Sequence, residues 1–255
     1  MIPEKRVRLV ISTLLMSVLF LFSTFFFFDK AFIFIPLLII FTYLLTFFAL
    51  LEGIEKNEWF MLFLMPILFT VAAYLFYFLF PVRWLTRIPF IVIYGTSIYA
   101  LLLASNIFNV GVEKNLQLYR AGFSVNYFFQ TVIFFLMANV IASFHWGFLA
   151  NAIVFSALAF VLSFQLYWSI RLDLHIRREV FQYALLTTLI VGEVSMLLSL
   201  LPVEASIYGL AISVCYYCVA GLTHLFIDER LFKHSLREYI TILVVIGIIV
   251  FLSFS

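Results

Sequence analysis

The stretch Asn106–Gly122 reads NIFNVGVEKNLQLYRAG and is a polar interval near the middle of an otherwise apolar chain. Apolar runs long enough to cross a bilayer lie on both sides of it, four before and five after. The stretch therefore divides the chain into three parts. We predict an N-terminal membrane block of residues 1–106, a connector of residues 107–121 and a C-terminal membrane block of residues 122–255.

The composition identifies the class of protein. The 255 residues are 66% hydrophobic and 11% charged, whereas a soluble domain has about 25% charged residues. Each apolar run is close to the length of about 20 residues that a helix needs to cross the hydrocarbon, and no alternating strand pattern is visible. The sequence predicts an all-α, polytopic integral membrane protein with about nine transmembrane helices. The predicted spans are residues 9–28, 31–51, 59–80, 88–106, 122–142, 148–169, 180–201, 205–227 and 238–254.

The distribution of positive charge predicts the orientation in the membrane. Of the 15 Lys and Arg residues, all but Lys30, Arg83 and Arg87 fall on the side of the N-terminus when the nine spans alternate in direction. Loops rich in Lys and Arg stay in the cytoplasm. We therefore predict a cytoplasmic N-terminus and an external C-terminus, in a multi-pass protein of the cell membrane.

The connector has the pattern of an amphipathic helix. Its apolar residues recur at helical spacing, and polar residues occupy another face. Asn109 is a candidate N-cap for this helix. We expect a helix that lies in the inner interface or extends the fifth span into the cytoplasm. The apolar positions are Val112, Leu116, Tyr119 and Phe123.

Side-chain size predicts which spans pack together. Small residues favour close helix contacts in membranes, whereas bulky apolar residues suit a lipid-facing surface. The sixth and eighth spans carry small-residue stripes, so we expect spans six to eight to pack closely. Phenylalanines crowd the first four spans, which predicts a more peripheral aromatic block there. The stripes are Ala152, Ser156, Ala159 and Ser163 on span six, and Ala205, Gly209 and Ser213 on span eight.

Glu193 is the acidic residue that lies well inside a predicted span. An ionisable group in this position is a candidate functional residue because its burial in lipid is costly. Gln182 lies on nearly the same helical face. Asn139, His145 and Asn151 fall near the outer ends of spans five and six. Glu193, these three residues and Glu204 of the outer loop could line one outward-opening cavity. Glu193 would then be a proton or cation site, or a ligand contact. The alternative is a protonated Glu193 that hydrogen-bonds to a neighbouring helix.

Two other groups of residues have simpler interpretations. Asn126 and Gln130 share a face of span five, and Gln165 falls at similar depth on span six, which predicts hydrogen bonding between these helices. Cys215 and Cys218 form a C-x-x-C pair, a spacing used in dithiol chemistry. These cysteines fall near the middle of a span and have no second pair to exchange electrons with. We therefore expect two inert thiols.

The predicted cytoplasmic loops carry charged residues. Arg171, Arg177 and Arg178 flank a short loop and are expected to contact anionic lipid headgroups. His224 and Asp228 lie four residues apart, but two ligands are too few for a metal site. We assign no catalytic residue, no metal and no cofactor from the sequence.

The sequence leaves three functional hypotheses open. It contains no phosphate-binding loop, dinucleotide fingerprint, metalloprotease or hydrolase motif and no sign of nucleic-acid binding. The favoured hypothesis is a non-catalytic membrane subunit, scaffold or sensor. The alternatives are a small transporter or flippase-like carrier that uses Glu193, and a membrane-embedded enzyme. The enzyme would use Glu193 with His145 for acid/base chemistry, or the two cysteines for redox chemistry. The expected partners are the lipid bilayer, anionic lipid headgroups and another membrane subunit.

Overall fold

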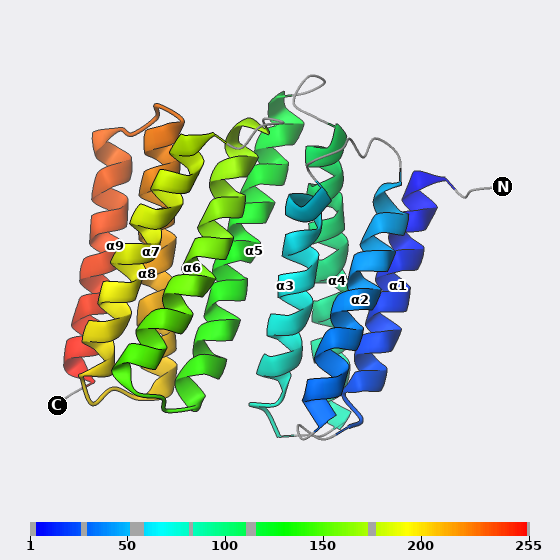
Figure 1. Ribbon diagram of the computed structural model, residues 1–255, viewed down its shortest axis with the longest axis horizontal. Coiled ribbons are helices and arrows are strands. Elements are labelled where there is room, and N and C mark those ends of the chain that lie inside the picture. The colour runs from blue at the N-terminus through cyan, green and yellow to red at the C-terminus, as the bar shows by residue number, and fades with distance from the viewer. Residues whose placement is uncertain are drawn as a thin grey trace. The chain divides into compact units, whose positions relative to one another are not determined.

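The computed structural model describes residues 4–26, 30–51, 59–81, 84–110, 116–172 and 177–253. The described residues form nine α-helices, each long and apolar enough to cross a membrane (Figure 1). This architecture confirms the predicted all-helical fold and is typical of a multi-pass membrane protein. The helices are α1 (Lys5–Ser23), α2 (Ala31–Leu50), α3 (Trp59–Tyr77), α4 (Trp84–Val110), α5 (Leu116–Ser143), α6 (Phe148–Arg171), α7 (Arg178–Ser199), α8 (Ala205–Ile227) and α9 (Lys233–Leu252).

The chain forms two compact units, Met1–Phe129 and Gln130–Ser255, and the division falls inside α5. The predicted connector is largely helical where it is described, because α4 continues to Val110 and α5 begins at Leu116. Residues 111–115 lie outside the described residues. The predicted N-cap at Asn109 is wrong. This residue lies in the last turn of α4, where its Nδ2 donates to the Leu50 carbonyl at 3.3 Å.

Aromatic rings fill the core of the first unit. Phe20 of α1 is fully buried and stacks on Tyr94 of α4, with ring centroids 4.1 Å apart. Phe69 of α3 also stacks on Tyr94, with ring centroids 5.9 Å apart. Offset and edge-on ring contacts of this kind add to the free energy gained from burial. The phenylalanine-rich sequence thus builds the interior of this unit as well as its surface.

A proline in α3 leaves a backbone carbonyl that another helix satisfies. Pro66 has no N–H, so the carbonyl four residues earlier, at Leu62, loses its helical partner. Ser105 of α4 donates its hydroxyl to this carbonyl at 3.1 Å. In a helix surrounded by lipid such a replacement is required, because water is not available to bind the carbonyl.

Arg87 joins three helices at one end of the first unit. Its side chain is 7% exposed. The guanidinium donates to the Thr24 carbonyl at 3.0 Å and to the Tyr77 hydroxyl at 3.2 Å. It also lies over the rings of Phe25 and Trp84, at 4.3 and 5.2 Å. A planar cation suits such a site because it can stack and donate in its plane at the same time.

In the second unit, α6 and α7 approach closely at small residues. A Cβ atom on Gly192 of α7 would collide with the Ser156 hydroxyl of α6. Similarly, a Cβ on Gly209 of α8 would lie 3.0 Å from the Asn139 amide of α5. Helix α7 contacts both α6 and α8 (Figure 1). The predicted close packing of spans six, seven and eight is therefore confirmed.

A buried polar cluster links α5, α6 and α8 within the second unit. Gln130 of α5 donates its Nε2 to Oε1 of Gln165 on α6, as the sequence predicted. Tyr216 of α8 donates its hydroxyl to Oε1 of Gln130 at 2.9 Å. All three side chains are at most 1% exposed. These bonds fix the mutual rotation of the three helices.

Candidate functional site

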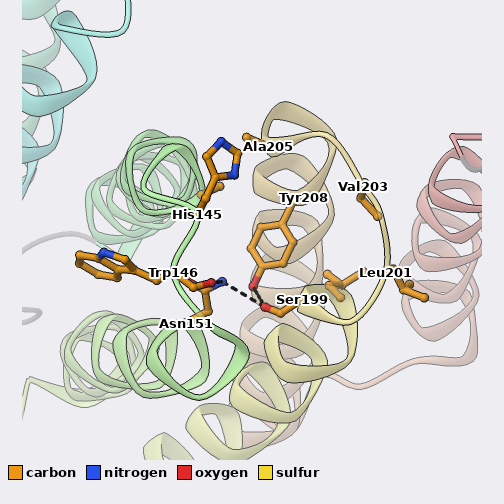
Figure 2. Close-up of a pocket in the computed structure, with 10 residues that line it drawn as sticks. His145, Trp146, Asn151, Ser199, Leu201, Val203, Ala205 and Tyr208 are labelled. Atoms are coloured by element: carbon orange, nitrogen blue, oxygen red, sulfur yellow. Dashed lines mark hydrogen bonds between the residues drawn. The ribbon is translucent and has the colours of Figure 1, made fainter.

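Two loops at the same end of the second unit enclose a pocket of about 200 Å³ (Figure 2). One loop joins α5 to α6 and the other joins α7 to α8. His145 of the α5–α6 loop has a left-handed backbone conformation, with φ 50°. Gly147 of the same loop is the N-cap of α6. The pocket is lined by Ala142, His145, Trp146, Asn151, Leu198, Ser199, Leu201, Val203, Ala205 and Tyr208.

Asn151 is the central polar residue of this pocket. It lies in the first turn of α6 and is 7% exposed. Its Nδ2 donates to the Trp146 carbonyl at 3.2 Å and to the Ser199 hydroxyl at 3.1 Å. Figure 2 shows the indole of Trp146 turned away from Tyr208, so Trp146 reaches the amide through its backbone. Asn151 thereby holds the α5–α6 loop against the end of α7.

The hydroxyl groups behind Asn151 satisfy one another. Ser199 donates to the Ser195 carbonyl at 2.8 Å and lies 3.1 Å from the Tyr208 hydroxyl. The Tyr208 hydroxyl lies 2.8 Å from the Ser195 hydroxyl and 3.1 Å from the Ser195 carbonyl. These contacts connect α6, α7 and α8. They leave few hydroxyl hydrogens free to donate to a ligand.

One polar atom of the pocket residues is left over. Oδ1 of Asn151 is buried and has no hydrogen-bond partner among the described residues. The orientation of the amide is fixed by its neighbours, because a carbonyl oxygen such as that of Trp146 can only accept. The amide nitrogen must face that carbonyl, and Oδ1 must therefore face elsewhere. Asn151, a residue of the pocket lining, therefore carries an acceptor that needs a donor.

The structure brings together some of the predicted site residues and separates others. His145 and Asn151 both line the pocket. Asn139 lies outside the lining, where its Nδ2 donates to the Phe135 carbonyl of its own helix at 2.8 Å. Glu193 and Gln182 are exposed on α7 and are not among the lining residues.

Glu193 and Gln182 share one exposed face of α7. Successive residues of a helix are rotated by about 100°, so positions 182, 186, 189, 193, 196 and 200 form one stripe. All six are exposed. Ala184, Thr187, Val191, Gly192, Ser195 and Leu198 of the same helix are buried. The polar groups of this exposed stripe are the Glu193 carboxyl and the Gln182 amide. Its other residues are apolar: Leu186, Leu189, Met196 and Leu200.

The remaining predicted residues keep their simpler interpretations. Arg171 ends α6, and Arg177 and Arg178 are exposed at the start of α7. Contact with anionic lipid stays a prediction for these three. Cys215 and Cys218 are free and buried in α8. Within the described ranges, no group of three or more His, Cys, Asp or Glu side chains could hold a metal ion.

Ser195, Ser199 and Tyr208 belong to the polar network but do not follow from the sequence arguments above. Ser195 and Ser199 lie four residues apart and share a face at the end of α7. That spacing, followed by a tyrosine in the first turn of the next helix, is the signal that points to a cluster. This signal identifies the pocket only when it is known that the α5–α6 and α7–α8 loops lie together.

The described residues form a helical protein whose nine helices are long and apolar enough to cross a membrane, with a small polar pocket at one end of its second unit. A protein family described as "Protein of unknown function (DUF5656)" matches residues 112–253. This match covers more than half of the chain, so the protein belongs to that family. The matched region includes α5 to α9. No curated protein and no solved structure matches the chain.

Proposed function

We propose that this protein is a non-catalytic subunit of the cell membrane that pairs with a second copy of itself through the exposed face of α7. The observation that carries the proposal is the exposure of Glu193 and Gln182 on one apolar stripe. The predicted topology, with a cytoplasmic N-terminus, is adopted for this proposal because of the charge distribution described above.

The position of Glu193 along α7 makes contact with lipid unfavourable. It lies six residues before the last residue of the helix, which is roughly 9 Å from that end. Because the hydrocarbon is about 30 Å thick, a spanning α7 holds the carboxyl inside it. An acidic side chain there costs on the order of 2–3 kcal/mol on insertion scales. Covering the carboxyl with protein relieves this cost.

A second copy fits this face because both polar groups are self-complementary. A carboxyl that carries a proton has both a donor and acceptors, and so does an amide. A two-fold axis perpendicular to the membrane places identical residues of two copies at the same depth. Glu193 can then share a proton with Glu193 of the second copy, and the two Gln182 amides can bond at a lower level. The leucines between them provide apolar contact.

The carrier and enzyme hypotheses receive less support from the geometry. Both need the Glu193 carboxyl in a cavity, and the enzyme hypothesis pairs it with His145. His145 lines the pocket, whereas Glu193 does not. The scaffold or subunit hypothesis requires only that Glu193 lies on a surface.

The test is the dimer dissociation constant of the full chain in lipid vesicles. Labelled protein is diluted over a range of protein-to-lipid ratios and followed by energy transfer between copies. Glu193→Leu should weaken the dimer about 3- to 30-fold, the range expected for losing one interhelical hydrogen bond in a membrane. Glu193→Gln should retain the dimer, because the amide is also self-complementary.

Glu179→Gln is the matched control, since it removes one acidic charge from the first turn of the same helix. It should leave the dissociation constant unchanged. Leu189→Cys should form a disulfide between copies, whereas Ile153→Cys, on an exposed face of α6, should not. A monomer at every dilution, or a dimer that Glu193→Leu does not weaken, contradicts the proposal.

A further inference from the structure

We propose that the pocket formed by the α5–α6 and α7–α8 loops binds a primary ammonium group, from a lipid headgroup or from a free amine, through Oδ1 of Asn151. This binding site is independent of the α7 face. It rests on the pocket itself, the unpartnered buried oxygen and the charge around the opening.

The hydrogen bonds already made in the pocket indicate that a ligand must act as a donor. Both hydrogens of the Asn151 amide are used, on Trp146 and on Ser199. The Ser199 hydroxyl donates to the Ser195 carbonyl. Asn151 Oδ1 remains without a donor in the described part of the chain. At the rim, the exposed His145 offers another acceptor nitrogen when its imidazole is neutral. A ligand with several N–H groups matches this arrangement.

The surrounding charge selects a cation over an anion. Glu204 lies between Val203 and Ala205, and both of these neighbours line the pocket. The sequence has no Lys or Arg between Arg120 and Arg171 or between Arg178 and Arg230, so the helices on both sides of the pocket bring no basic residue to this end. A negative group beside a pocket raises the local concentration of cations.

The depth of the pocket makes a lipid headgroup one source of the ammonium. The α5–α6 loop carries the exposed aromatic residues Phe144 and Trp146, and the exposed Phe148 begins α6. Aromatic side chains favour the interface between lipid and water. Ethanolamine headgroups lie at that level and have N–H donors. Choline headgroups are also cationic but have none. A volume of about 200 Å³ holds several water-sized groups, at about 30 Å³ each, and so suits a group of a few heavy atoms.

The first test compares the two headgroups. The purified full chain is mixed with equal amounts of phosphatidylethanolamine and phosphatidylcholine of the same acyl chains, and bound lipids are counted by native mass spectrometry. We expect a preference of roughly tenfold or more for phosphatidylethanolamine, the size of one charge-assisted hydrogen bond. Asn151→Leu should abolish the preference. Asn139→Leu is the matched control and should keep it, because it makes the same change at a residue outside the pocket lining.

The second test separates the lipid from a free amine. Ethanolamine is added to the protein in phosphatidylcholine nanodiscs, and the thermal transition is measured. A rise that Asn151→Leu abolishes identifies a free amine as a ligand, whereas a lipid preference without this rise identifies the headgroup as the source. Val203→Phe, which fills the pocket and leaves the Asn151 amide untouched, should remove either effect. If there is neither effect, or if the lipid preference survives both Asn151→Leu and Val203→Phe, the proposal is overturned and the pocket holds water only.

Discussion

The buried cluster of Gln130, Gln165 and Tyr216 leads to a prediction in which a second substitution repairs the damage of the first. Gln130 lies between the other two, since it donates to Gln165 and accepts from Tyr216. Replacing Gln130 by Leu removes the acceptor of the Tyr216 hydroxyl and the hydrogen bond that Gln130 donates to Gln165. Each loss in the interior costs about 1–3 kcal/mol. We expect Gln130→Leu to lower the free energy of unfolding by about 2–4 kcal/mol.

Adding Tyr216→Phe to Gln130→Leu removes the unsatisfied hydroxyl. The ring itself is retained, and with it the stacking on Phe134, where the centroids are 4.4 Å apart and the planes differ by 3°. The double variant should therefore be about 1–2 kcal/mol more stable than Gln130→Leu alone. In the wild-type background the same Tyr216→Phe should destabilise by about 1 kcal/mol, because it deprives Gln130 of a donor. Tyr216→Phe is thus expected to stabilise the Gln130→Leu variant and to destabilise the wild-type protein.

The measurement is the free energy of unfolding in bicelles or mixed micelles, determined for the four proteins of the cycle. Tyr217→Phe in the Gln130→Leu background is the control, because Tyr217 is the adjacent tyrosine and its ring contacts Tyr239 in α9. It should bring no gain. A double variant less stable than Gln130→Leu would refute the argument that unsatisfied polar groups dominate the stability of this cluster.

Three further predictions follow from contacts outside the cluster. Arg87→Lys should lower the free energy of unfolding by about 1–3 kcal/mol in the same assay, since an ammonium cannot stack and donate as the guanidinium does; an unchanged value would contradict the role given to the planar cation. Gly192→Ala should destabilise by about 1 kcal/mol and Ser156→Ala should reduce that loss, because the two positions collide directly; additive losses would exclude this contact. Cys215 and Cys218, both buried, should react with a maleimide far more slowly in bicelles than after unfolding in detergent, and rapid labelling of the folded protein would show that α8 is accessible.

The helices could be predicted because each apolar run has the length that the hydrocarbon requires. The end of α4 could not be predicted in the same way, because Asn106 and Asn109 end the apolar run but continue the helix. The start of α5 at Leu116 agrees with the predicted extension of the fifth span, which rested on the amphipathic pattern of the connector and not on the length of an apolar run. Hydropathy detects where side chains become polar, whereas the backbone continues its hydrogen bonding until a residue interrupts it.

The pocket could be predicted only in part. His145 and Asn151 lie close in the sequence, so one loop brings them together. Ser199 and Tyr208 come from a different loop, and their meeting with Asn151 depends on the order in which helices pack. The exposure of Glu193 could be predicted from the sequence. Gly192 and Ser195 mark the packed face of α7, and Glu193 lies on the opposite side of the helix.

Helix α5 determines where this protein can be cut and recombined. The two compact units divide between Phe129 and Gln130, yet the helix runs without interruption from Leu116 to Ser143. A fragment that begins at Gln130 would start with four backbone N–H groups exposed at mid-bilayer. The family match begins at residue 112, before the helix does. A transferable five-helix fragment should begin there, so a fragment expressed from residue 112 should insert, whereas one expressed from residue 130 should be degraded.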